Sequence, residues 1–153
     1  MSLAILYSRA QTGVEAPLVT VEVHLSNGLP ALAIVGLPEA AVRESKERVR
    51  AALLNANFDF PARRITINLA PADLPKEGGR YDLAIALGIL VASGQLPATA
   101  CAQHEFIGEL ALTGELRPTH GVLPAAVQAA RAGRALIVPA ANAAEGEIGR
   151  AHV

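Results

Sequence analysis

Hydrophobic and polar residues alternate through residues 19–25, a pattern that predicts a strand with one buried face. The apolar positions of this strand are Val19, Val21, Val23 and Leu25. Asn27 and Gly28 follow almost at once, and both residue types tolerate the positive φ angles of a tight hairpin turn. We therefore predict that residues 31–36 return as the antiparallel neighbour of this strand.

Apolar runs and helical periodicity elsewhere predict an alternation of strands and helices, about six or seven strands and three helices in all. Further strands are expected at 3–10, 65–70, 106 onward with a turn at Thr113-Gly114, and 135–139, and helices at 38–55, 81–93 and 122–131. The helix at 81–93 is apolar on nearly every side, so we expect it to lie centrally, with other elements covering it.

Composition narrows the class of protein. With 153 residues, of which 52% are hydrophobic, the chain is expected to form one domain with a substantial core. Its net charge of −1 provides no global basic field for nucleic acid. A single cysteine fits a reducing compartment, and no apolar run reaches the roughly 18 residues of a membrane span. The N-terminus lacks the pattern of a signal peptide, so a cytoplasmic domain without membrane contact is expected.

The segment 65–87 is the strongest candidate for a functional site, since it predicts a buried strand, a proline-rich loop, a Gly-Gly turn and an apolar helix. Its polar and glycine positions form the candidate interaction surface: Lys76, Glu77, Gly78, Gly79, Arg80 and Asp82. The loop contains no Ser, Thr, Cys or His. We favour an ion network at the helix start. The alternative is a hydrolase that uses an acid pair among Asp73, Glu77 and Asp82.

Arg43 and Lys46 on the first predicted helix are candidate phosphate contacts. Glutamates interleave with them, so a solvated face or a protein contact is the favoured interpretation, and direct DNA binding is a further alternative. Two Tyr, three Phe and no Trp leave few stacking platforms for single-stranded DNA. The four histidines lie far apart, so no metal site is expected, and no phosphate-binding P-loop motif occurs.

Three ordered blocks at 36–53, 65–87 and 106–127 resemble the ComM/YifB family of magnesium-chelatase-like AAA+ ATPases. The resemblance implies that residues 1–146 are the family's N-terminal domain, which is similar to the Lon protease catalytic domain. The implied fold is a two-layer α/β (α+β) domain with a mixed sheet and a left-handed βαβ crossover. Residues 147–153 resemble a translated sequencing adapter, so we expect a truncated chain with a non-native tail.

The resemblance also implies a function. Family members are hexameric, ATP-driven DNA motors that promote branch migration during natural transformation. ATP and Mg²⁺ would belong to the missing AAA+ module, with no cofactor in this segment. The expected partners are that module, neighbouring subunits and, through the complete protein, DNA. Arg80 falls where a Lon-like protease has its serine, and Leu123 about where it has its lysine. We therefore expect a non-catalytic accessory domain without protease activity.

Overall fold

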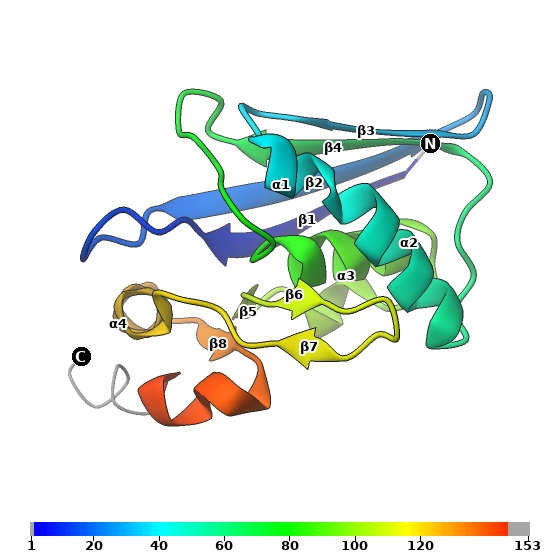
Figure 1. The fold of residues 1–153 in the computed structure, drawn as a ribbon. Coiled ribbons are helices and arrows are strands. Elements are labelled where there is room, and N and C mark those ends of the chain that lie inside the picture. The colour runs from blue at the N-terminus through cyan, green and yellow to red at the C-terminus, as the bar shows by residue number, and fades with distance from the viewer. Residues whose placement is uncertain (1, 147–153) are drawn as a thin grey trace.

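A four-stranded mixed sheet forms one layer of the molecule in the computed structural model, which describes residues 2–146 (Figure 1). The strands are β1 (Ser2–Arg9), β2 (Leu18–Ser26), β3 (Ala31–Val35) and β4 (Arg64–Ala70). Their order is β1-β2-β4-β3; β1 and β4 pair antiparallel with β2, and β3 pairs parallel with β4. The expected mixed α/β architecture is confirmed.

The predicted hairpin between β2 and β3 is wrong. β4 lies between them, so β3 is an edge strand that runs parallel to β4. Gly28 has a φ of 141°, whereas Asn27 keeps a negative φ, so the pair does not form the turn with two positive φ angles that the sequence favours. β4 takes this place with Ile65, Ile67 and Leu69, all buried opposite the alternating apolar positions of β2.

Two consecutive helices, α1 (Ala40–Arg43) and α2 (Ser45–Asn55), connect β3 to β4. The sequence predicted a single helix over this region, and the structure divides it at Glu44. Glu44 keeps backbone angles close to those of a helix (φ −65°, ψ −14°), and it is the single residue that separates α1 from α2.

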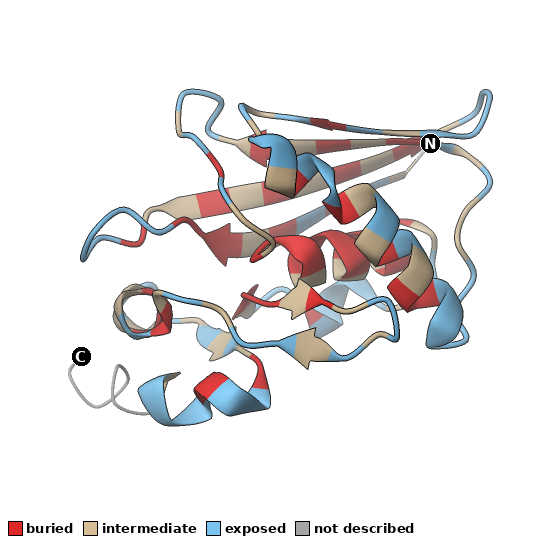
Figure 2. Ribbon diagram, in the orientation of Figure 1, coloured by how far each residue is buried: buried red, intermediate tan, exposed pale blue. Residues whose placement is uncertain are grey.

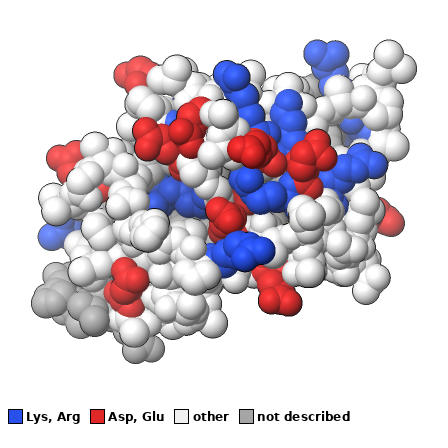
Figure 3. All heavy atoms as spheres, in the orientation of Figure 1, with Lys and Arg blue, Asp and Glu red and all other residues white. Residues whose placement is uncertain are grey.

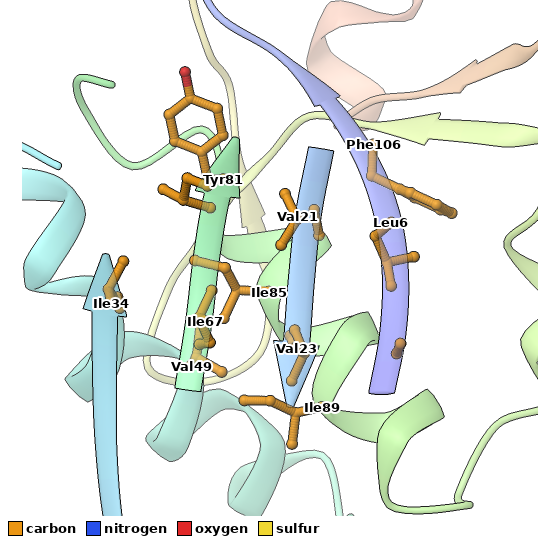
Figure 4. Packing of buried hydrophobic residues seen from close by; sticks show 14 of the residues in the cluster. Leu6, Val21, Val23, Ile34, Val49, Ile67, Tyr81, Ile85, Ile89 and Phe106 are labelled. Atoms are coloured by element: carbon orange, nitrogen blue, oxygen red, sulfur yellow. The ribbon is translucent and has the colours of Figure 1, made fainter. Parts of the chain in front are cut away.

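The predicted central helix is confirmed as α3 (Asp82–Ala92), which packs beneath β1 and β2 and beside α2. Figure 4 shows Ile85 and Ile89 of this helix among the valines of β2. Gly88 permits the close approach, because a Cβ there would lie 2.5 Å from Val23 Cγ2. Figure 2 shows buried residues concentrated in the sheet and in α3.

The second half of the chain lies on the side of α3 opposite the sheet in Figure 1. It consists of η1 (Ala98–Ala100), β5 (His104–Phe106), β6 (Glu109–Leu110), β7 (Leu116–Arg117), α4 (Val122–Arg131), β8 (Ala135–Ile137) and η2 (Ala140–Asn142). β5 pairs parallel with β8, and β6 pairs antiparallel with β7 across the predicted turn. None of the helices within residues 2–146 has the length and apolar character that crossing a bilayer requires.

Candidate functional site

A cleft of about 830 Å³ opens at the N-terminal end of α3. Three segments that are far apart in the sequence form its walls, together with one glutamate directly before α1 and one from β6. The lining residues are 10–13, 74, 75, 77–81, 118–120, Glu39 and Glu109. The predicted Gly-Gly loop therefore lies in a concave site.

Arg80 lies in the floor of the cleft and is 6% exposed. Its Nε donates to the Arg9 carbonyl at 2.8 Å, and its Nη1 donates to the His120 carbonyl at 2.8 Å. Nη2 has no hydrogen-bond partner among the residues that the structure describes. Burial lowers the pKa of the guanidinium. No carboxylate within residues 2–146 pairs with it, so the floor of the cleft holds an uncompensated cation.

Lys76 is fully buried beneath the same loop. Its Nζ donates to the Gly36 carbonyl at 2.6 Å and also to the Pro71 carbonyl. Burial lowers its pKa, and the nearby charge of Asp73 opposes that shift. Gly36 cannot carry a side chain, because a Cβ there would lie 2.1 Å from the Leu69 carbonyl oxygen. Lys76 therefore ties the proline-rich loop to the tight turn that follows β3.

Asp82 begins α3 and is also fully buried. Its carboxylate accepts hydrogen bonds from Arg48 Nε at 2.6 Å, from the Ser45 hydroxyl and from the Leu110 amide at 3.0 Å. The predicted ion network of Asp73, Glu77 and Asp82 with Lys76 and Arg80 is wrong, since no salt bridge joins any of these five residues to another of the five within residues 2–146. Because Asp82 points toward α2, its partners come from α2 and β6, whereas Lys76 and Arg80 bond to backbone carbonyls.

Acidic side chains line the rim of the cleft. Glu77 is exposed, Glu39 Oε1 accepts a hydrogen bond from the Gly78 amide at 2.8 Å, and Glu109 lies 3.9 Å from Arg117. Glu109 also lies against Gly79, where a Cβ would be 2.4 Å from its Oε1. Glu77, Gly78 and Gly79 are thus accessible members of the predicted interaction surface.

The remaining three members of that predicted surface, Lys76, Arg80 and Asp82, are buried. The prediction that these three residues belong to an exposed polar surface is therefore wrong. Their hydrogen bonds hold the cleft in shape.

The alternative acid-pair site does not assemble in the structure. Asp73 and Glu77 are exposed, whereas Asp82 is buried and bonded to Arg48. Of these three residues, Glu77 alone lines the cleft.

Of the two positions that would correspond to a serine–lysine pair, Arg80 lines the cleft and Leu123 does not. Arg80 bonds to His120, close to the start of α4, where Leu123 is 38% exposed and lies outside the cleft lining. The side-chain hydroxyls in the lining belong to Thr12, Thr119 and Tyr81, and neither lysine of the chain lines the cleft. Burial raises the pKa of Tyr81 to about 12. A hydroxyl–lysine pair is therefore absent from this part of the described chain.

The described residues support neither a cysteine nucleophile nor a metal centre. Cys101 is buried, and burial raises the pKa of its thiol, which disfavours the nucleophilic thiolate. Within residues 2–146, no three His, Cys, Asp or Glu side chains are grouped so that they could hold a metal ion.

A buried ion triad that the sequence prediction missed lies beside the cleft. Glu105 is fully buried and accepts from Arg9 Nε at 2.6 Å and from Arg134 Nε at 2.9 Å. Arg134 also stacks over the Tyr7 ring, at 4.4 Å from its centroid. The signal in the sequence is weak, because Glu105 follows the polar residues Gln103 and His104 and precedes only a short apolar pair, Phe106-Ile107.

The predicted phosphate contacts lie on a different face. Arg43 is exposed at the end of α1, and Lys46 is partly buried in a second groove, of about 530 Å³, between α2 and β3. Figure 3 shows acidic and basic side chains interspersed on the face that carries these helices. A phosphate-binding role for Arg43 and Lys46 remains a prediction.

Sequence comparisons identify the family. Residues 21–142 match the family described as subunit ChlI of Mg-chelatase. The chain belongs to this magnesium-chelatase-like family. It is 62% identical over 148 residues to competence protein ComM of Haemophilus influenzae, and 59% identical over 145 residues to YifB of Salmonella typhimurium. These alignments cover 97% and 95% of the chain but 29% of each relative, so the chain spans under a third of their length.

Proposed function

We propose that this chain is a non-catalytic accessory domain of a ComM/YifB-type AAA+ ATPase. In this proposal the complete protein is a hexameric DNA motor that promotes branch migration in the cytoplasm. ATP and Mg²⁺ bind to a module outside these 153 residues. The domain contacts that module and neighbouring subunits, and meets DNA only as part of the complete protein.

The proposal includes a Lon-like fold, which the crossover from β3 through α1 and α2 to β4 supports. When the parallel strands β3 and β4 point upward, as in Figure 4, β3 lies to the left of β4 and the helices lie behind the sheet. This arrangement supports a left-handed crossover, which is rare among parallel βαβ units.

The observation that carries the proposal is the state of Arg80. At the position where a Lon-like hydrolase would carry its nucleophile, a guanidinium is bound to the carbonyls of Arg9 and His120. Nucleophilic catalysis needs an activatable hydroxyl and a base within hydrogen-bond reach. Arg80 offers neither.

Incubation of the chain with fluorescein-labelled casein tests the loss of hydrolysis. We expect no cleavage above buffer for the wild type and for Arg80→Ala, whereas a known protease in parallel releases fluorescent peptides. Cleavage by the wild type that disappears in Arg80→Ala would overturn the proposal.

A second experiment tests the accessory role in the complete protein. Glu77→Arg reverses one charge on the exposed rim of the cleft, and Glu115→Arg makes the same change on an exposed turn outside the cleft. We expect Glu77→Arg to lower the ATP-dependent hexamer fraction in mass photometry, with Glu115→Arg matching the wild type. Equal hexamer fractions for both variants would remove the assembly role.

A further inference from the structure

The groove between α2 and β3 differs from the cleft in two respects. Its lining carries a net positive charge, and part of it comes from β3, the edge strand of the sheet. Its lining combines the start of β3, one face of α2 and the segment that precedes β4: Pro30, Ala31, Leu32, Lys46, Glu47, Arg50, Phe60, Pro61, Ala62 and Arg63. Three cations and one carboxylate face this space. A nearby extended segment would therefore meet a net positive surface.

These cations are not engaged elsewhere. Within residues 2–146, Lys46, Arg50 and Arg63 make no ion pair and no side-chain hydrogen bond. Arg50 lies over the Phe60 ring at 5.2 Å from its centroid. Their charges are thus available to a partner, in contrast to Arg48 on the same helix, which is bonded to Asp82.

The strand that contributes to the groove, β3, also has an open edge. β3 is the last strand in the sheet order, with β4 on one side and no strand of the described residues 2–146 on the other. The Ala31 amide donates toward β4, to the Arg63 carbonyl at 3.4 Å. Because successive residues of a strand direct their backbone groups to opposite sides, the amides of Leu32 and Ile34 face the open edge. An added strand can pair with them.

We propose that this groove binds an acidic protein segment in extended conformation, which adds to the edge of β3 and places carboxylates against Lys46, Arg50 and Arg63. An open strand edge supplies main-chain hydrogen bonds, and the cations supply selectivity for acidic side chains. Single-stranded nucleic acid fits less well, because the one aromatic ring in the lining, Phe60, is covered by Arg50. This inference does not depend on the proposed accessory function.

The probe is a fluorescein-labelled peptide of alternating glutamate and valine, about ten residues long, which matches the period of a strand. Its charge-reversed counterpart alternates lysine and valine, and an oligothymidylate of similar length represents nucleic acid. Fluorescence anisotropy measures the affinity of this chain for each probe. We expect the acidic peptide to bind more tightly than both others and to weaken as salt rises.

Two matched double variants locate the site. Lys46→Glu/Arg63→Glu reverses two groove charges and leaves the Arg50–Phe60 contact intact, whereas Arg117→Glu/Arg131→Glu makes the same change in net charge at exposed positions outside the groove. We expect the first to weaken binding by about tenfold and the second by less than about twofold. Equal losses in both variants would overturn the proposal.

Amide hydrogen exchange tests strand addition itself. Binding of the acidic peptide should slow exchange at Leu32 and Ile34, with little change at Ala33, whose amide faces β4. Unchanged exchange at both edge amides would overturn strand addition. Preferential binding of the oligothymidylate, lost in Lys46→Glu/Arg63→Glu, would replace the protein segment with nucleic acid.

Discussion

Two kinds of buried site in this molecule hold their cations in different ways. At Glu105 and Asp82, arginines meet a fully buried carboxylate. In and beneath the floor of the cleft, Lys76 and Arg80 bond to carbonyl oxygens. A carboxylate neutralises the charge it binds, whereas a carbonyl satisfies hydrogen bonds and leaves the charge in place.

The two kinds of site have different structural roles. The carboxylate networks join separate layers, since Glu105 links β5 to β1 and Asp82 links α3 to α2. The carbonyl-bound cations shape loops and leave positive charge near the cleft. Removing a carboxylate should therefore cost much more stability than removing a carbonyl-bound cation.

Glu105→Gln should produce the largest effect. The change leaves Arg9, which is almost fully buried, without its counter-charge. We expect the free energy of unfolding to fall by about 3–5 kcal/mol in urea denaturation. The matched change Glu115→Gln on an exposed turn should stay within about 0.5 kcal/mol of wild type. Similar values for both variants would contradict a structural role for the triad.

Asp82→Asn should cost less, about 2–3 kcal/mol in the same measurement. The difference arises because the Arg48 side chain is 21% exposed and keeps some contact with water after its partner is lost. Asp73→Asn, an exposed change in the neighbouring loop, provides the control. A larger loss for Asp82→Asn than for Glu105→Gln would reverse the expected ranking.

Lys76→Met should cost only about 1–2 kcal/mol at neutral pH, because losing two hydrogen bonds is partly offset by no longer burying a charge. It should also change the pH dependence. Burial lowers the pKa of folded Lys76 below its ordinary 10.5, so between these two values the unfolded chain binds more protons. Stability from this group therefore rises with pH across that window, and Lys76→Met removes the rise. Parallel pH profiles for wild type and variant would contradict the assignment.

Tyr81→Phe should have the smallest effect at neutral pH. Its buried hydroxyl has no hydrogen-bond partner among the described residues, so we expect stability to stay level or to rise by up to about 1 kcal/mol. The pKa of folded Tyr81 is raised to about 12 from 10.0, so between these values the unfolded chain binds fewer protons. Stability should then fall with pH by up to about 1.4 kcal/mol per unit, a slope opposite in sign to that of Lys76.

The slope attributed to Tyr81 should be absent in Tyr81→Phe, whereas Tyr7→Phe should retain it. Retention of the alkaline loss in Tyr81→Phe would assign the slope to another group. A loss of stability at neutral pH would instead indicate that the Tyr81 hydroxyl has a partner, such as bound water.

Local patterns in the sequence predicted the helices and strands themselves better than they predicted which elements lie next to one another. The alternation of β2 correctly gave the buried face of Val19, Val21, Val23 and Leu25, and the uniform apolar character of α3 correctly gave its central place. Both properties depend on residues within one element. The Asn27-Gly28 pair led to a wrong prediction. A local turn preference carries no information about a competing strand some forty residues later in the sequence.

The candidate site shows the same limit. The sequence indicated the Gly-Gly loop, which does line a cleft, but not which of its charged residues face inward. Asp82 bonds to Arg48, and Glu105 to Arg9, across long separations along the chain. Partner choice of this kind depends on tertiary packing, so nearby residues such as Lys76 were the wrong candidates for Asp82.

The placement of β4 between β2 and β3 has a consequence for synthesis on the ribosome. A nascent chain that has reached Val35 can pair β1 with β2, but both the far edge of β2 and the whole of β3 wait for residues 64–70. An isolated two-stranded ribbon is marginally stable in water, and open apolar edges attract other chains. Emergence of Ala70 is therefore the earliest moment at which the four-stranded sheet can form. Translational pausing before that point would prolong the exposure of β3 and of the edge of β2 that later pairs with β4.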